Sequence, residues 1–597
     1  MTETIQQLAA EKFPDLTDAE RKLTEAMDRG VPAVFGDPAK DNTDPENHPG
    51  HADQWGQERT LRAEVLRWLC IDVGVSAAVD VRGIQIHAAK IRGVLDLSFA
   101  LVRFPLRLYQ CAIPDGINLI DTETRRLSLS GSHTGPITGD GVVVRGDIFL
   151  QGDFRATGAV LLRGAKIGGN LTCNGGRFLN RGGHALSADR AEVDGGVFLD
   201  QGFRALGEVR LLGAKIGSNL ECRGGRFLNR GGHALSADGA EVGGDVFFVQ
   251  GFRALGKVRL LGAKIGGDLT CNGGRFLNRG GDALSADRAE VGGSVFLDRS
   301  FHTTGWITLA GSRIKGQLSC EQARFGGRGH PGLSMENATV EGTFLWKEVH
   351  RSPETELKLA HATLGPMVDD KDSWPESGKL HLDGLTYNTF AQASPCNARE
   401  RLEWLQRQPA LPFRPQPYQQ LAEVLRRSGH EADAKKVLIA RERARCKHGG
   451  LTRKGRVWSV ILDVMIGHGY KPYKIIPWGA VFVLLGWALF YYGHEAGRMV
   501  PIDGGAYAST EYRQTRKPPA GYPAFNAFLY SLDTFLPIVD LHQETYWEPS
   551  SGSYCTGWGQ SDCYDPLLRF YLWFQILAGW FVTTLGVAGF TGLVRKD

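Results

Sequence analysis

Apolar and polar positions repeat along the middle of the chain with a fixed period. From Gly164 the sequence reads GAKIGGNLTCNGGRFLNRGGHALSADRAEVDGGVFLDQGFRALGEVRLL, and it begins again at Gly213 and, more loosely, at Gly262. A period of 49 residues links four cysteines: Cys173, Cys222, Cys271 and Cys320. Each unit contains two weaker copies of itself, so apolar anchors recur at alternating steps of 26 and 23 residues: Ile167, Val193, Ile216, Val242, Ile265, Val291, Ile314 and Val340. Such a period indicates stacked structural repeats.

A step of about two dozen residues is too short for a helix-hairpin repeat, and these repeats are too rich in glycine. The pattern predicts one turn of a β-solenoid per step, with coils roughly 4.8 Å apart. Three short strands are expected per coil, at residues 170–173, 177–180 and 185–193, with Gly-Gly pairs at the corners. Three asparagines in one column are expected to take left-handed corner geometry: Asn180, Asn229 and Asn278. The fold class is therefore mainly β, a right-handed β-helix of about a dozen coils.

The charges that precede the anchors support this register. They alternate in sign on successive coils: Lys166, Glu192, Lys215, Glu241, Lys264, Glu290 and Arg313. Opposite charges on neighbouring coils attract, and like charges are kept two coils apart. The cysteines also lie two coils apart, too far for disulfides. We expect them to be buried as small apolar side chains.

The same pattern extends in a weaker form to both sides. Ile91, Ile113 and Val144 continue the anchor series towards the N-terminus, and the gap of 31 residues before Val144 predicts a longer loop near residues 130–141. After Val340 the series fades through Leu364 and Leu385. The β-helix is therefore expected over residues 81–396.

The flanking segments have helical patterns. Residues 1–80 are expected to form a helical cap, with Thr17 capping a helix to about Met27 and a second, amphipathic helix at 54–69. Residues 397–456 predict a helical hairpin that acts as an adaptor. Its two helices are expected to face each other through six apolar residues: Leu421, Val424, Leu425, Ala434, Val437 and Leu438.

Residues 457–597 have the composition of a membrane module. Two apolar segments, 475–493 and 568–594, are long enough to cross a bilayer. Basic residues precede the first and follow the second: Arg453, Lys454, Arg456, Lys471, Lys474, Arg595 and Lys596. Loops on the cytoplasmic side of a membrane are enriched in Lys and Arg. We therefore expect a multi-pass protein in a lipid bilayer with both termini in the cytoplasm. Loop 494–566 is expected on the outer side.

The outer loop holds two candidate sites. Cys555 and Cys563 lie on the oxidising side and are candidates for a disulfide, with a free pair as the alternative. A short apolar helix at 525–536 contains Asp533 and is followed by the polar residues Asp540, His542 and Glu544. This layout fits a re-entrant pore loop, or else an amphipathic helix on the outer leaflet.

Small residues form one stripe of the second span: Gly579, Thr583, Gly586 and Gly589. Small side chains allow membrane helices to approach closely. The stripe therefore predicts tight packing and a homo-oligomer.

Net charge and the absence of known motifs exclude several classes of function. The net charge of the 597 residues is +4, which gives no signal for a nucleic-acid partner, and none is expected. The N-terminus lacks a signal-peptide pattern. Dinucleotide, haem, phosphate-loop and nucleophile-elbow motifs are absent from the sequence, so no cofactor and no catalytic residue is expected. His184 and His233 share a column with Asp282 but are two coils apart, which argues against a metal site.

Several segments resemble a known group of proteins. The resemblance rests on FLYSLDTFLPIVDLHQETYWEP, RFYLWFQILAGWFVTTLGVAGFTGLVRKD, PYQQLAEVLRRSGHEADAKKVLIARER and the coils that contain AKIGG. They are similar to uncharacterised bacterial membrane-anchored β-helical proteins, pentapeptide-repeat-like, which are sometimes named membrane-associated oxidoreductases. The resemblance implies this domain layout and the bacterial inner membrane, and it places no catalytic residue.

Two functions are consistent with these patterns. The first is a non-catalytic membrane-anchored scaffold or sensor whose cytoplasmic β-helix binds a protein or ligand. The second is an oligomeric two-span channel or membrane effector gated by the β-helix. A membrane-associated oxidoreductase, as similar proteins are named, is a distant third.

Overall fold

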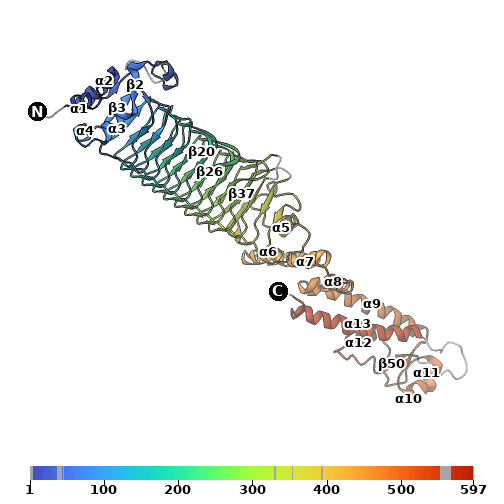
Figure 1. Cartoon of the computed structure of the whole chain (residues 1–597). Coiled ribbons are helices and arrows are strands. Elements are labelled where there is room, and N and C mark those ends of the chain that lie inside the picture. Colours follow the sequence, from blue (N-terminus) through green and yellow to red (C-terminus); the bar gives the residue numbers. More distant parts are fainter. Residues whose placement is uncertain are drawn as a thin grey trace. The chain divides into compact units, whose positions relative to one another are not determined.

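The structure is a computed structural model, and it describes residues 4–36, 44, 46–327, 331–351, 354–391, 394–550 and 566–595. The chain forms two compact units (Figure 1). The solenoid unit contains residues 1–410 and 423–428, and the helical unit contains residues 411–422 and 429–597.

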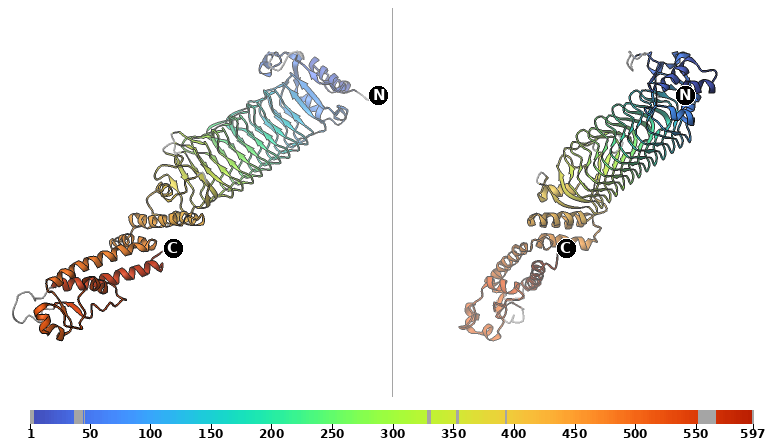
Figure 2. Two further views of the ribbon diagram at one scale, coloured as in Figure 1. Left: turned by 180° about the vertical axis from the view of Figure 1, so that it is seen from behind. Right: turned by 90° about the vertical axis from the view of Figure 1, so that its left-hand side faces the viewer.

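The solenoid unit is a parallel β-solenoid of about 13 turns. Its coils stack from β3 (Ile84–His87) to β48 (Thr386–Phe390), as Figures 1 and 2 show from three sides. Within the described residues, the strands belong to two sheets of 26 and 22 strands, here sheets A and B. The predicted β-solenoid over the middle of the chain is confirmed.

One coil contains more strands than the pattern predicted. In the coil at residues 143–161, sheet A receives β14 (Val143–Val144) and β15 (Ile148–Phe149), and sheet B receives β16 (Arg155–Ala156) and β17 (Val160–Leu161). In the central coils the sheet B pair merges into one long strand, such as β20 (Arg177–Ser187) or β23 (Arg204–Arg210). The expected three strands per coil are present in these central coils, but their bounds differ: residues 177–180 and 185–187 belong to one strand, and Gly-Gly pairs mark only some corners. Arg190, with φ of 56°, turns another.

The predicted alternation of charge is present in the pairing register. β18 (Lys166–Ile167), β21 (Glu192–Val193) and β24 (Lys215–Ile216) pair residue for residue, and the series continues through β38 (Arg313–Ile314). The anchor column from Ile167 to Val340 is therefore confirmed.

The extension towards the N-terminus is confirmed for Val144 and wrong by half a coil for Ile91 and Ile113. The column before Ile167 runs through Val144, Thr124 and Val102. Ile91 and Ile113 lie in sheet B instead. The expected loop at 130–141 is a regular part of a coil, with β12 (His133–Thr134) and β13 (Ile137–Thr138). The error arises because every face of the coil uses the same short apolar pattern. At the other end Val340 pairs with Leu364, and Leu364 pairs with Tyr387 rather than Leu385.

The core is built from vertical stacks of like side chains. The four column cysteines are fully buried and free, and burial raises the pKa of each thiol above its ordinary value. A second stack contains aromatic rings with centroids 5.2–6.3 Å apart: Phe154, Phe178, Phe203, Phe227, Phe252, Phe276, Phe301 and Phe325. Such aromatic contacts contribute about 0.5–1.5 kcal/mol each beyond burial.

The asparagine column does not turn the chain. Asn180 Nδ2 donates a hydrogen bond to the carbonyl of His184 at 2.9 Å, and Asn229 and Asn278 make the equivalent bond. The left-handed residue is Gly182, with φ of +77°. The asparagines therefore bridge the loop from inside, and the predicted left-handed geometry is wrong for them.

The N-terminal end combines helices with strands. It contains α1 (Ile5–Lys12), α2 (Asp18–Asp28), α3 (Ala63–Ile71) and α4 (Val73–Ala78), and Thr17 caps α2 as expected. The predicted helix at 54–69 begins only at Ala63. The residues before it form 3-10 turns η1 (Pro49–Gln54) and η2 (Gln57–Arg59) and then β2 (Thr60–Arg62). β1 (Ala33–Val34) pairs with β3 and β2 with β4 (Lys90–Arg92), which covers the open sheet edges.

Glu20 joins α2 to β2. Its buried carboxylate accepts hydrogen bonds from Arg62 Nε at 2.8 Å and from the Arg62 backbone N–H at 3.1 Å. Burial raises the pKa of Glu20, but the hydrogen bonds from Arg62 and Thr17 outweigh it and leave the pKa below its ordinary value. The contribution to stability is therefore present above the ordinary carboxyl pKa and is lost as the pH falls through the lowered one.

We expect Glu20→Gln to reduce the free energy of unfolding at neutral pH by about 1–3 kcal/mol, because Arg62 loses a buried charged acceptor. The variant should also lose less stability than the parent protein between about pH 5 and pH 3. Thermal unfolding followed by circular dichroism at several pH values measures both effects. Glu25→Gln, at an exposed ion pair with Arg29, is the control, and equal acid sensitivity of parent and Glu20→Gln would contradict the assignment.

The C-terminal end of the solenoid unit is closed by α5 (Ala398–Leu405). Arg401 on this helix forms a fully buried ion pair with Asp369 of β46 (Thr363–Asp369), at 2.7 Å. The guanidinium also lies 3.5 Å from the ring centre of Phe390. The last coil is thus covered by a helix that is attached through a buried charge.

The helical unit contains two long apolar helices. α9 (Ile475–Glu495), with the turn before it, and α13 (Pro566–Phe590) are both long and apolar enough to cross a membrane. The expected second span, 568–594, begins slightly earlier and ends at Phe590. Before them lie α7 (Glu431–His448) and α8 (Arg453–Ile466), and α6 (Gln416–Arg427) precedes α7. All six apolar residues predicted for the hairpin are buried.

Between the long helices, the described chain forms three short helices and one antiparallel pair of strands. These are α10 (Gly504–Ala508), α11 (Thr510–Thr515), α12 (Ala527–Phe535) and the antiparallel pair β49 (Met499–Pro501) and β50 (Trp547–Pro549). α12 corresponds to the apolar helix expected at 525–536, and it packs against both α9 and α13.

Candidate functional site

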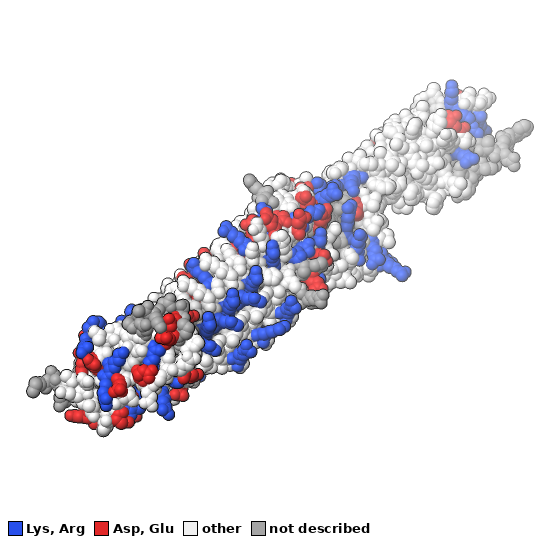
Figure 3. Space-filling model, turned by 90° about the horizontal axis from the view of Figure 1, so that it is seen from above, with Lys and Arg blue, Asp and Glu red and all other residues white. Residues whose placement is uncertain are grey.

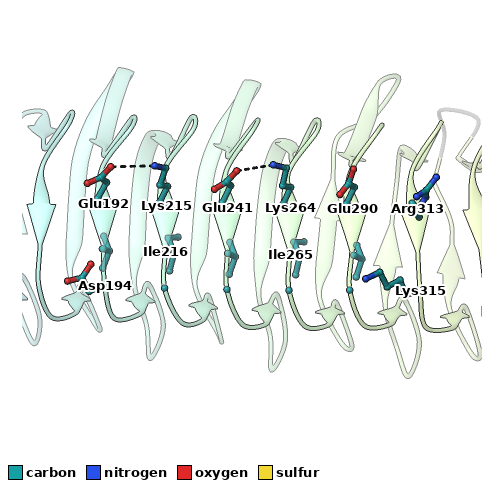
Figure 4. Close-up of a pocket in the computed structure, with 17 residues that line it drawn as sticks. Glu192, Asp194, Lys215, Ile216, Glu241, Lys264, Ile265, Glu290, Arg313 and Lys315 are labelled. Carbon is teal, nitrogen blue, oxygen red and sulfur yellow. Dashed lines mark hydrogen bonds and ion pairs between the residues drawn. The ribbon is translucent and has the colours of Figure 1, made fainter.

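The outer face of sheet A carries a long groove of about 1060 Å³ along the charge ladder. Figure 4 shows Glu192 directed towards Lys215 and Glu241 towards Lys264, with ion-pair distances of 3.5 and 3.0 Å. The hydrogen bond from Lys264 lowers the pKa of Glu241. These two pairs join neighbouring coils, so the ladder contributes to coil register.

Sheet B carries a different column, which we call the arginine row. Residue by residue, the register aligns Arg155, Arg177, Arg204, Arg226, Arg253, Arg275, His302 and Arg324. Every arginine of the row is exposed. On the face drawn in Figure 3, Lys and Arg side chains gather over the middle coils of the solenoid.

The arginine row is poorly compensated. Arg177 has a carboxylate nearby, that of Asp153 at 3.9 Å. Within the part of the chain that the structure describes, the other arginines of the row have no carboxylate within 4.0 Å. Adjacent coils are roughly 4.8 Å apart, and like charges directly opposite each other destabilise a sheet. The row is therefore a surface on which an external anion would relieve repulsion.

Leucines run beside the arginine row on the same strands. Leu179, Leu206, Leu228, Leu255 and Leu277 pair in register and are half-buried. On every second coil the strand continues into a projecting turn with an exposed arginine at its tip: Arg181, Arg230 and Arg279. A hollow of about 290 Å³ opens between the first two tips over the leucines. The face thus has an apolar floor with cationic edges.

Across the corner of the coil, on sheet A, lies a column that we call the phenylalanine row. Phe149, Phe198, Phe247 and Phe296 point outward on alternate coils and are half-buried. Each lies six residues before a member of the arginine row or before His302. Arg223 lies 4.4 Å from the ring centre of Phe247, and a hollow of about 370 Å³ opens there, lined also by Thr270 and Arg299.

Both rows were missed in the sequence, although a signal was present. The phrases GGRFL and GFRAL each place arginine at one coil position, but they are separated by steps of 27 and 22 residues. The apolar anchors recur at steps of 26 and 23 residues, so their register does not align these arginines. His184 and His233 of sheet B are closer to a common group than expected, because both approach Glu208, at 3.5 and 3.6 Å. Among the described residues, no three potential ligands gather as a metal site would need.

The pore-loop candidates separate into one buried and three exposed residues. The carboxylate of Asp533 accepts backbone hydrogen bonds from Leu541 at 2.6 Å, Gln543 at 2.7 Å and Glu544 at 2.9 Å. Asp540, His542 and Glu544 are exposed, and Asp540 pairs with His542 at 3.1 Å. Asp533 therefore holds the turn after α12, and its oxygens are directed to the backbone of its own chain.

The small-residue stripe of α13 contacts other parts of the same unit. A methyl group at Gly579 would lie 2.0 Å from the carbonyl oxygen of Phe535, at the end of α12. Gly586 approaches Ile475, Gly589 approaches Pro472 and Ile466, and Thr583 lines an apolar groove with Gly586. The close packing that was predicted for the stripe occurs within one chain.

A buried polar contact joins the three apolar helices. Gln575 Nε2 on α13 donates to the carbonyl and hydroxyl oxygens of Ser531 at 2.7 and 2.9 Å. The Ser531 hydroxyl donates to the carbonyl of Val483 on α9 at 2.7 Å. Gly486 provides the space, since a methyl group there would lie 2.3 Å from Gln575 Oε1. Such bonds connect helices in an apolar environment.

The disulfide candidates Cys555 and Cys563 lie outside the described residues. In comparisons with known proteins, no family model, no curated protein and no solved structure matches the chain.

Proposed function

We propose that this protein is a non-catalytic, membrane-anchored scaffold or sensor. In this proposal the solenoid, with right-handed coils, binds a partner in the bacterial cytoplasm. The helical unit holds it in the inner membrane with both termini inside. The observation that carries the proposal is the arginine row, because exposed and largely unpaired like charges along one face favour binding of an external anionic group.

Two features support a membrane role for the helical unit. α9 and α13 expose many large apolar side chains, including Leu484, Trp487, Phe574 and Leu577. Their polar contacts are directed inward, through Gln575 and Ser531. A helix pair with an apolar exterior and polar contacts directed inward fits a bilayer.

The membrane part of the proposal predicts integral behaviour and a defined topology. After alkaline carbonate extraction, the full-length chain should remain in the membrane pellet. A fluorescent protein fused to the C-terminus should fluoresce, and alkaline phosphatase inserted near residue 520 should be active, because clusters of basic residues precede the first span and follow the second. Release of the chain by carbonate, or the reverse reporter pattern, would contradict the anchoring. Fusion of the same reporters to a known cytoplasmic protein provides the control.

A further inference from the structure

We propose that the corner of the solenoid between the arginine row and the phenylalanine row binds a single-stranded nucleic acid. Phosphates would contact the arginines, and bases would pack on the exposed phenylalanine faces. This inference rests on the proposed function, since it names the partner of the same face.

The choice of arginine indicates a group with two oxygen acceptors, such as phosphate, rather than diffuse negative charge. Apart from His302, every member of the row is arginine, whereas three of the four cations in the charge ladder of sheet A are lysine: Lys166, Lys215 and Lys264. The planar guanidinium fork donates two parallel hydrogen bonds to a phosphate, which an ammonium group does not. The row is also straight and evenly spaced, as suits a linear polymer with one charge per repeat.

The side chains beneath and beside the row position these arginines. Phe178, Phe203, Phe227 and their stack lie inside the same coils, next in sequence to row arginines, and fix the strands rigidly. The half-buried leucines provide an apolar surface for the arginine stems, which leaves the charged heads in water. The guanidinium groups are therefore presented outward as a preorganised array.

The phenylalanine row gives the partner its second property. Its members lie two coils, roughly 10 Å, apart, and each is partly exposed. Exposed aromatic faces beside a basic track are the arrangement on which unpaired bases stack, and every base has such a face. Arg299 adds a cationic group at the Phe247 hollow, whereas Arg223 there is paired with Glu221 at 3.2 Å. Phosphate and base sites therefore lie on either side of one coil corner.

Other anionic partners fit less well. A bilayer surface would contact the projecting Arg181, Arg230 and Arg279, but it has no planar groups for the phenylalanine hollows. A paired duplex would present phosphates while its bases remain stacked within it. The net charge of +4 did not suggest nucleic acid because it averages the row with acidic residues elsewhere, whereas binding depends on local charge.

The test measures binding of a fluorescein-labelled oligouridylate of about 30 nucleotides by anisotropy, with the full-length protein in neutral phosphatidylcholine nanodiscs. The row variant carries Arg204→Gln, Arg226→Gln, Arg253→Gln and Arg275→Gln. We expect its dissociation constant to rise at least tenfold. The slope of log affinity against log salt should become flatter by about 3, because each lost phosphate contact removes about 0.7.

A matched control removes the same number of charges from the ladder: Lys166→Gln, Lys215→Gln, Lys264→Gln and Arg313→Gln. Because both variants have the same net charge, the control should keep its affinity within about twofold and its salt slope unchanged. Equal losses in the two variants would overturn the assignment of the site. Unchanged circular dichroism spectra establish that both variants are folded.

A second variant set tests the bases separately from the phosphates. Phe198→Ala with Phe247→Ala should weaken binding about tenfold without changing the salt slope, whereas Phe247→Tyr should retain it, because stacking needs an aromatic face. Inorganic polyphosphate should compete weakly. If polyphosphate competed strongly and the phenylalanine variants bound the oligonucleotide with unchanged affinity, the nucleic-acid assignment would be overturned.

Two further outcomes are decisive. Binding of vesicles rich in phosphatidylglycerol without binding of the oligonucleotide would identify the bilayer surface as the occupant and overturn the proposal. Release of the chain by carbonate would refute the membrane anchoring alone, because the anisotropy experiment measures the solenoid face independently.

Discussion

Replacing Arg401 with methionine is expected to reduce the free energy of unfolding of the solenoid by about 3–5 kcal/mol, the usual cost of removing one partner from a buried ion pair. Arg401 is fully buried, and its Nη atoms donate to both oxygens of Asp369 at 2.7 and 2.8 Å. Its Nε donates to the carbonyl of Pro395 at 2.6 Å. Without Arg401, the carboxylate of Asp369 remains buried with Trp374 Nε1 as its neighbouring side-chain donor.

The double variant Arg401→Met with Asp369→Asn should recover much of this loss, because the uncompensated charge is then removed as well. Arg399→Met is the control, since Arg399 is almost fully exposed on the same helix. Thermal and urea unfolding followed by circular dichroism measure the difference. If Arg401→Met and Arg399→Met unfolded alike, α5 would not be attached through this pair.

Replacing Asp533 with alanine is expected to have the second-largest effect, a loss of about 3–5 kcal/mol in the helical unit. Three backbone N–H groups, at residues 541, 543 and 544, lose their charged acceptor together. Hydrogen bonds to charged groups contribute about 1.5–3 kcal/mol each, and they are not fully additive when they share one group. The turn after α12 should become accessible to protease even where the long helices persist.

Asp540→Ala provides the matched control, because Asp540 is exposed and bonds mainly to the nearby backbone of His542, at 2.7 Å. Its expected loss is below about 1 kcal/mol. Protein purified in mild detergent can be followed by tryptophan fluorescence, since Trp547 is buried in this unit. Similar melting temperatures for Asp533→Ala and the parent protein would show that the three hydrogen bonds do not hold the turn.

The repeating pattern was sufficient to predict the fold of the middle of the chain. Charges that alternate on successive coils, from Lys166 to Arg313, can be read without coordinates because each attraction links residues at a fixed separation. The same holds for the cysteine column, since a residue that recurs at one position of a regular coil must recur in one environment. The two apolar helices were likewise evident from length and composition.

Where the pattern is shared by several faces, the sequence alone was ambiguous. Ile91 and Ile113 satisfy the apolar pattern of sheet A, yet they lie in sheet B, because a shift of half a coil still directs apolar residues inward. The helix expected at 54–69 failed for a related reason. An amphipathic helix was compatible with those residues, but the open sheet edge near Lys90 is satisfied only when residues 60–62 form a strand.

The sequence by itself determined the repeat, the axial charge pairing, the buried columns and the two apolar helices, because each depends on spacing along the chain. Only the tertiary structure decided which outward-facing residues of successive coils are aligned in one column. The arginines are separated by steps of 27 and 22 residues and the phenylalanines by 49, so their rows become neighbours only once coils with and without the projecting turn are stacked. The same applies to Asp533 and Arg401, whose roles depend on backbone groups and a carboxylate that chain folding brings into contact.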